Sequence, residues 1–214
     1  MTSLEEFENW HIKPNQGLGL LSFGMTPKDV GQYNAIYGSN PASHTYGHSA
    51  DNFLSNLGEF STFFSTEVLQ GAQKAASVFD AKTAGLKSEI RTEKYYMGLE
   101  YFEDALTSIS LADDCAFAHI QNRTLFSEKP QSILAHLQRL NGGAKIYKND
   151  VIFDNLGIML SNFYPLIEKN KSQHPDKSHL DDQTKSMTIF SESQINRYLT
   201  PEFTHFDFCQ HEKF

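Results

Sequence analysis

The sequence predicts an α+β fold, in which helices pack on an antiparallel sheet. Residues 95–102 alternate between apolar and other side chains, and a period of two is typical of a strand with one buried face. Several other segments carry apolar residues at steps of three and four, which is the period of an amphipathic helix. Two-residue turn candidates separate the strand-like segments, and such short turns favour hairpins over parallel crossovers.

Composition and charge limit the classes of partner that the protein can have. The chain has 214 residues, of which 39% are hydrophobic and 21% are charged. A domain of this size buries roughly 70% of the surface that its unfolded chain exposes, so we expect a single domain, 1–214. The formal net charge of −8 disfavours nucleic acid as a direct partner and suits a basic protein. The simpler alternative is that this charge only keeps the protein in solution.

The sequence predicts a cytoplasmic protein. The segment MTSLEEFENW has no apolar run of the kind found in a secretory signal, and no stretch approaches the ~18 apolar residues of a membrane span. Cys115 and Cys209 show no metal-binding or redox spacing, and we expect Cys115 to be a small core residue.

The first predicted unit, residues 10–38, is a β–α unit. Residues 10–13 alternate as a short edge strand does, and residues 17–22 supply a glycine turn and a short apolar strand. A helix then begins with its start signals in place, because Thr26 is an N-cap candidate, Pro27 suits the first helical position, and Asp29 can reach back to the cap. Gly38 is the expected stop.

A two-helix insertion is predicted at residues 50–90. It follows a loop-like segment, 39–51, that is rich in Ser, Asn, Gly and His. Apolar residues at helical spacing predict one helix over 53–64 and a second over 66–90.

The region 94–164 is predicted to hold the sheet and a second β–α unit. We expect strands at 95–102, 105–111, 116–121, 145–148, 151–153 and 155–160, with turns at Glu103-Asp104, Asp113-Asp114 and Asn149-Asp150. Between them, FSEKPQSILAHLQRLNGG aligns with FGMTPKDVGQYNAIYG, since each places a proline at a helix start and a glycine at its end. One explanation is that the two units are related halves that arose by duplication. The other is that they are unrelated, because any strand–turn–helix unit uses these residue types.

The last region, 168–214, begins with a polar loop at 168–186. A short strand at 187–190 and a short helix at 191–199, with Ser191 as its cap candidate, are predicted to follow. The tail contains Phe203, Phe206 and Phe208, which are aromatic enough to dock on the body of the protein.

Catalytic and cofactor motifs are scarce. His44 and His48 have the most metal-like spacing, but Pro41 and Gly47 argue against the helix that would bring both rings to one face. Gly17-Leu18-Gly19 is separated from the helix by a strand, so it is not a dinucleotide fingerprint. We therefore expect no catalytic residues, no metal and no cofactor, and His119 and His136 are expected to be structural.

The segment IKPNQGLGLLSFGMTPKDV resembles the opening signature of a group of small bacterial proteins that includes predicted immunity proteins of polymorphic, contact-dependent and type VI secreted toxin systems. YYMGLEYFEDALTSISL and VIFDNLGIML are similar to that group's hairpin and closing strand. About half of the chain is covered, and the segments 50–90 and 168–186 depart from the shorter members. The resemblance implies a protein that neutralises a cognate toxin by binding it, and it carries over no catalytic residue.

Six residues at predicted turns are the candidates for contacting such a partner: Glu103, Asp104, Asp113, Asp114, Asn149 and Asp150. Acidic side chains there would occupy a site that a basic toxin keeps for an anionic substrate. Two alternatives remain open. One is a small metal-dependent hydrolase using His44 and His48, and the other is an adaptor or chaperone that binds a secreted effector without inhibiting it. The oligomeric state is left open by the sequence.

Overall fold

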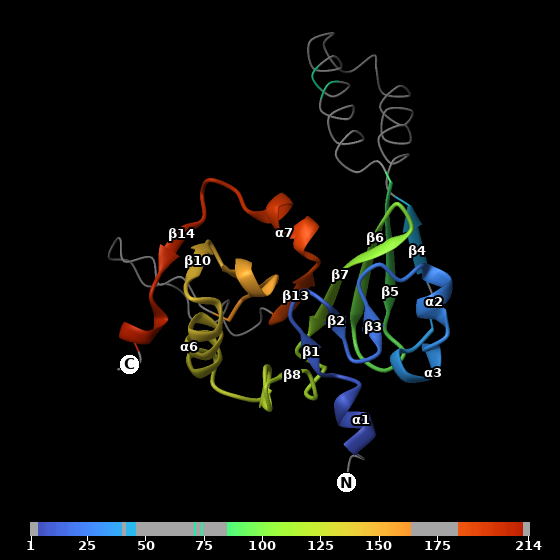
Figure 1. The fold of residues 1–214 in the computed structure, drawn as a ribbon, viewed down its shortest axis with the longest axis horizontal. Helices are drawn as coiled ribbons and strands as arrows, with labels where there is room; N and C mark the ends of the chain where they lie inside the picture. Colours follow the sequence, from blue (N-terminus) through green and yellow to red (C-terminus); the bar gives the residue numbers. More distant parts are fainter. Residues whose placement is uncertain are drawn as a thin grey trace, which may run out of the picture.

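A large antiparallel sheet forms the centre of the protein, as Figure 1 shows. The computed structural model describes residues 4–39, 42–45, 71, 74, 85–163 and 184–211. In spatial order the nine strands are β14 (Thr204–Phe206), β10 (Ala144–Tyr147), β11 (Asp150–Phe153), β12 (Ile158–Ser161), β13 (Ser186–Phe190), β7 (Ala105–Ala112), β6 (Met97–Phe102), β5 (Leu86–Arg91) and β4 (Ala42–Thr45). All neighbouring strands are antiparallel, so the predicted α+β class is confirmed.

The sheet buries one face in the main core and part of the other under a helix. On β6 the side chains of Met97, Leu99 and Tyr101 are buried in turn, and they belong to the main apolar cluster together with residues of α6 (Pro130–Asn141). On the opposite face, Ile195 of α7 (Glu192–Tyr198) packs in a second cluster with residues of β11 and β13. Removal of these apolar side chains from water stabilises the fold, at about 25 cal/mol per Å².

The opening unit contains the predicted cap but a broken helix. The Thr26 hydroxyl accepts a hydrogen bond from the Asp29 backbone N–H, and the Asp29 carboxylate accepts one from the Thr26 N–H, which confirms the capping box. The helix is split into α2 (Pro27–Gly31) and α3 (Asn34–Tyr37), with Tyr33 outside helical geometry. After the break between α2 and α3, the side chain of Tyr37 is buried. Its hydroxyl donates a hydrogen bond to the Asn9 carbonyl and accepts one from the Leu20 N–H.

Two small sheets and two short helices accompany the large sheet. They are β1 (Ile12–Lys13), β2 (Gly17–Leu18) and β3 (Leu21–Ser22) in one sheet, β8 (His119–Ile120) and β9 (Arg123–Thr124) in the other, and the helices α1 (Leu4–Glu8) and η4 (Phe208–His211). The prediction of a strand over 116–121 next to the 105–111 strand was wrong. Only 119–120 is extended, because the His119 N–H bonds to the Trp10 carbonyl and not to β7, and β7 pairs instead with β13.

The predicted insertion joins two strands that lie side by side. β4 pairs with β5 so that Thr45 is opposite Lys87, and residues 46–85 therefore leave and re-enter the sheet at neighbouring positions. The helix expected at 53–64 lies outside the described residues. The prediction that a second helix extends to residue 90 was wrong. Gly85 has a positive φ of 79°, and the chain continues as β5 from Leu86.

Two strand boundaries differ from those predicted. Tyr147 pairs with Asp150, so the β10–β11 turn is formed by Lys148 and Asn149 and not by Asn149-Asp150. The strand expected from residue 155 begins at Ile158, after the short 3₁₀ helix η2 (Asp154–Leu156) and a left-handed glycine.

The C-terminal elements follow the prediction. β13, α7 and the docked tail are confirmed, with Phe208 buried in the main core. Residues 168–183 of the polar loop lie outside the described residues, and Ser186 already belongs to β13. Both helices compared as a repeat begin at a proline, but α6 runs unbroken for 12 residues where α2 and α3 are separate, and a common origin stays a prediction. Among the described residues, no helix has the length and apolar character needed to cross a membrane.

Candidate functional site

The six predicted contact residues fall into two groups at opposite ends of β7. Reading across the sheet, Asp150 is opposite Ser161, Ser161 opposite Ser186, and Ser186 opposite Ala112. Adjacent strands are about 4.8 Å apart, and β11 is separated from β7 by β12 and β13. The β10–β11 turn and the turn after β7 therefore lie roughly 15 Å apart, at the same end of the sheet's strands. We call the residues Asp113, Asp114, Asn149 and Asp150 the acidic end. Glu103 and Asp104 precede β7, so they lie at the other end of the strand.

Hydrogen bonds hold the carboxylates of the acidic end. Asp114 accepts from the Tyr96 N–H at 2.8 Å, and Asp113 accepts from the Lys185 N–H at 3.3 Å. Asp150 accepts from the Ser161 hydroxyl at 2.6 Å. Asp113 and Asp114 are exposed, and a carboxylate can accept several hydrogen bonds, so these groups keep acceptor capacity that faces solvent.

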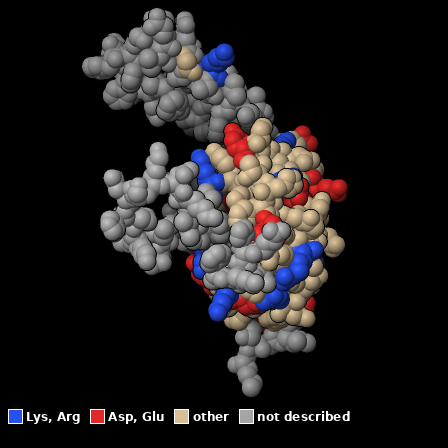
Figure 2. Space-filling view, turned by 90° about the vertical axis from the view of Figure 1, so that its left-hand side faces the viewer, with Lys and Arg blue, Asp and Glu red and all other residues tan. Residues whose placement is uncertain are grey.

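The charge around this end is mixed. Lys148 lies in the β10–β11 turn, and Lys185 immediately precedes β13. The surface view in Figure 2 likewise shows basic and acidic side chains interspersed over the described part of one face. Any electrostatic attraction to a basic partner therefore comes from a local excess of a few carboxylates, and we expect its effect on binding to be moderate.

The other predicted pair forms a tight hairpin turn. Glu103 and Asp104 both have positive φ values, 51° and 62°, as a two-residue turn between antiparallel strands requires. Asp104 forms an ion pair with Lys87, with Nζ and Oδ1 2.5 Å apart, and both side chains are largely exposed. Its charge is thus balanced locally, which distinguishes this turn from the acidic end.

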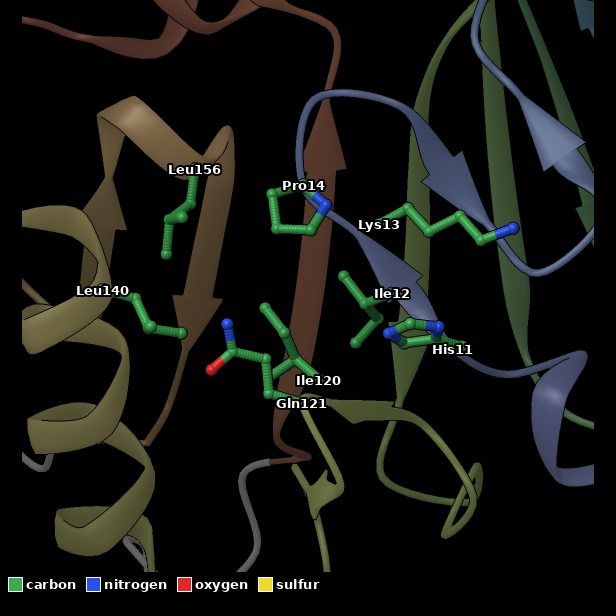
Figure 3. Close-up of a pocket in the computed structure, with 8 residues that line it drawn as sticks. All are labelled: His11, Ile12, Lys13, Pro14, Ile120, Gln121, Leu140 and Leu156. Atoms are coloured by element: carbon green, nitrogen blue, oxygen red, sulfur yellow. The ribbon is translucent and has the colours of Figure 1, made fainter.

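A pocket of about 370 Å³ lies between β1, the β8–β9 turn, the end of α6 and η2 (Figure 3). Its lining residues are mainly apolar: His11, Ile12, Lys13, Pro14, Ile120, Gln121, Leu140 and Leu156. Figure 3 shows the Gln121 amide directed toward Leu140, whereas the Lys13 amine points away from the pocket and donates to the Gly19 carbonyl at 2.7 Å. The lining offers no carboxylate, so acid–base chemistry there would depend on His11 alone.

Beside this pocket three rings form a stack. The Phe7 and His119 ring centroids are 3.8 Å apart, those of His11 and His119 are 5.0 Å apart, and both pairs are nearly parallel. His119 is 2% exposed, and its Nδ1 lies 3.0 Å from the Phe117 carbonyl oxygen. Burial lowers the pKa of His119 below its ordinary value. The expectation of a structural role for this histidine agrees with its burial, but the stack itself could not be predicted, because its rings come from three separate segments.

A buried charged cluster lies under α3. Arg91 is 1% exposed and donates to the Gly38 carbonyl at 2.8 Å, to Asn34 Oδ1 at 3.0 Å and to the Glu89 carboxylate at 3.2 Å. The Tyr101 hydroxyl also donates to Glu89, at 3.2 Å. This cluster was missed from the sequence because residues 86–90 were assigned to a helix. In a strand, Glu89 and Arg91 share a face, and that spacing is the signal that could have found them.

One member of the metal-like histidine pair lies within the described residues. His44 lies in β4 opposite Ser88, and His48 is outside the described residues. Within the described ranges, no group of three or more His, Cys, Asp or Glu side chains could hold a metal ion. Cys115 is a free, buried thiol, as expected, and burial raises its pKa to about 12.

Comparison with known proteins adds no relative: no family model, curated protein or solved structure matches the chain.

Proposed function

We propose that the protein is an immunity protein, which binds a cognate bacterial toxin or effector domain and neutralises it by occluding its active site. The resemblance of the segment from Ile12 to Val30 to the opening signature of such proteins supports this class. The formal net charge of −8 suits a basic toxin. The observation that supports the proposal most directly is the acidic end, where Asp113 and Asp114 of the turn after β7 and Asp150, the first residue of β11, lie at the same end of the sheet's strands.

The proposed mechanism is electrostatic steering followed by occlusion. A toxin that acts on an anionic substrate presents cations in its active site, and exposed carboxylates can take the place of the substrate's phosphate or carboxylate groups. Because Asp113 and Asp114 are held by backbone N–H donors, little conformational entropy is lost when they dock. The shape of the rest of the interface would set most of the affinity, because charge complementarity mainly changes the association rate.

The test uses the toxin domain encoded next to this gene, if the neighbouring reading frame specifies a large secreted protein with a variable C-terminal domain. Co-expression of the two proteins should restore growth. We expect the double variant D113N/D114N to bind with an association rate about 3- to 10-fold lower at low salt, and with a weaker salt dependence. Asparagine keeps a side-chain acceptor, so the hydrogen bonds to the Tyr96 and Lys185 N–H groups can persist.

The matched control is E103Q/D104N, which removes two charges at the opposite end of β7. It should leave the association rate within about twofold of wild type, since it lies away from the acidic end. Equal effects of the two double variants, or none from either, would contradict the role of the acidic end. Tight binding without restored growth would contradict the immunity class itself and favour an adaptor or chaperone.

A further inference from the structure

The short N-terminal helix α1 packs against the body of the protein with Phe7 stacked on the ring of a buried histidine. Phe7 lies flat on His119, with an interplanar angle of 16°, and His11 of the β1 segment lies on the other side of His119 at an angle of 11°. Figure 1 shows α1 beside β8, at the end of the chain and away from the large sheet. A helix of five residues is not stable alone, so its position depends on such contacts.

We propose that α1 is a pH-sensitive latch, which protonation of His119 releases from the body of the protein. The proposal is independent of the immunity function. His119 is 2% exposed when α1 is docked, so a charge on this ring would lose most of its hydration. Release of Phe7 exposes the ring to water and removes that penalty.

The groups that face His119 act on its pKa in both directions, and burial is the largest of these effects, so the pKa is lowered. His11 is stacked on the His119 ring, and a positive charge on the His11 ring would repel an imidazolium at His119, which lowers the pKa of His119 further. Glu8 is an acidic neighbour that acts to raise the pKa of His119, and its carboxylate lies 3.9 Å from His11 Nδ1. The Phe117 carbonyl accepts from Nδ1, which leaves Nε2 as the atom that takes the added proton.

The sign of the pH dependence follows from the lowered pKa of His119. With α1 docked, the ring binds a proton less well than in its exposed form, whose pKa is near the ordinary value of 6.5. Docking is therefore favoured above pH 6.5 and weakens as the pH falls below it. The opening equilibrium should rise by up to about tenfold per pH unit until the pKa of the docked state is reached.

The protein contains its own reporter for this opening. Trp10 is the only tryptophan in the chain, it lies two residues after α1, and it is 3% exposed against Tyr37 and Tyr95. Its fluorescence should change as α1 opens, while the far-ultraviolet circular dichroism of the large sheet stays constant.

The experiment follows Trp10 fluorescence of the full chain from pH 8 to pH 5. We expect a reversible transition below pH 6.5 in the wild type. The transition should be absent in His119→Phe, which keeps an aromatic ring against Phe7 but cannot take a proton. His136→Gln is the matched control: burial also lowers the pKa of His136, but it lies in α6, and the transition should persist in this variant.

A second measurement keeps the proposal testable if His119→Phe does not fold. The ring titrations of the histidines and the exchange of the Phe7 amide can be followed by NMR in the wild type. We expect His119 to titrate below 6.5, and Phe7 exchange, corrected for its intrinsic pH dependence, to accelerate over the same range. The proposal is overturned if Phe7 protection is independent of pH, or if the fluorescence transition survives in His119→Phe.

Discussion

Two ion pairs on the same face of β5 are placed in opposite environments. Arg91 and Glu89 are 1% and 10% exposed at their side chains and share further hydrogen bonds with Asn34, Gly38 and Tyr101. Lys87, near the start of the same strand, pairs with Asp104 of the β6–β7 turn, and these two side chains are 43% and 61% exposed. The two pairs have similar chemistry, so we expect burial, and not the presence of a pair, to decide how much each charge contributes to the stability of the fold.

The largest effect is expected from Arg91→Ala. Removal of the guanidinium leaves the Glu89 carboxylate buried without its cation and the Gly38 carbonyl without its donor. The free energy of unfolding should fall by about 3–5 kcal/mol, as it does when one partner of a buried pair is removed. Urea denaturation measures the change. A loss below about 1 kcal/mol would show that the interior pair behaves like the surface pair.

A smaller effect is expected from Tyr101→Phe, which removes only the hydroxyl that donates to Glu89. A hydrogen bond to a buried charged group contributes about 1.5–3 kcal/mol, and the aromatic ring still fills its place in the core. Thermal unfolding provides the measurement. Tyr96→Phe serves as the comparison, because Tyr96 is 38% exposed on the same chain segment, and its change should stay within about 0.5 kcal/mol.

The smallest effect is expected from Lys87→Ala. An exposed ion pair contributes about 0.2–1 kcal/mol and is screened by salt. Denaturation at low and at high ionic strength separates this screened contribution from any loss of packing. If the destabilisation were large and insensitive to salt, the Lys87–Asp104 pair would have to be treated as part of the interior.

Local features of this fold were predictable from the sequence, and features that depend on pairing were not. The capping box of Thr26 and Asp29 and the turn at Glu103-Asp104 each depend on neighbours within a few residues, so the pattern alone indicates them. The strand beginning at Leu86 was predicted as helix because alanine and lysine favour helix upstream, and only the pairing with β6 overrides that preference.

The candidate sites show the same division. The individual acidic turns were predicted, but their grouping depends on the register that carries Asp150 across to Ala112, and the sequence does not specify which strand lies next to β7. The Arg91 cluster and the His119 stack each join segments far apart in the chain. No periodicity within one segment encodes such contacts.

The pairing of β4 with β5 has a consequence for how this chain tolerates change in length. Thr45 and Lys87 are held opposite each other by the sheet, so the segment between them is a closed loop whatever it contains. The entropy cost of closing a flexible loop grows only with the logarithm of its length, about 0.6 kcal/mol for each doubling. A segment can therefore be gained, lost or exchanged at this position with little effect on the sheet, which makes the β4–β5 junction the place where related chains are expected to differ most in size.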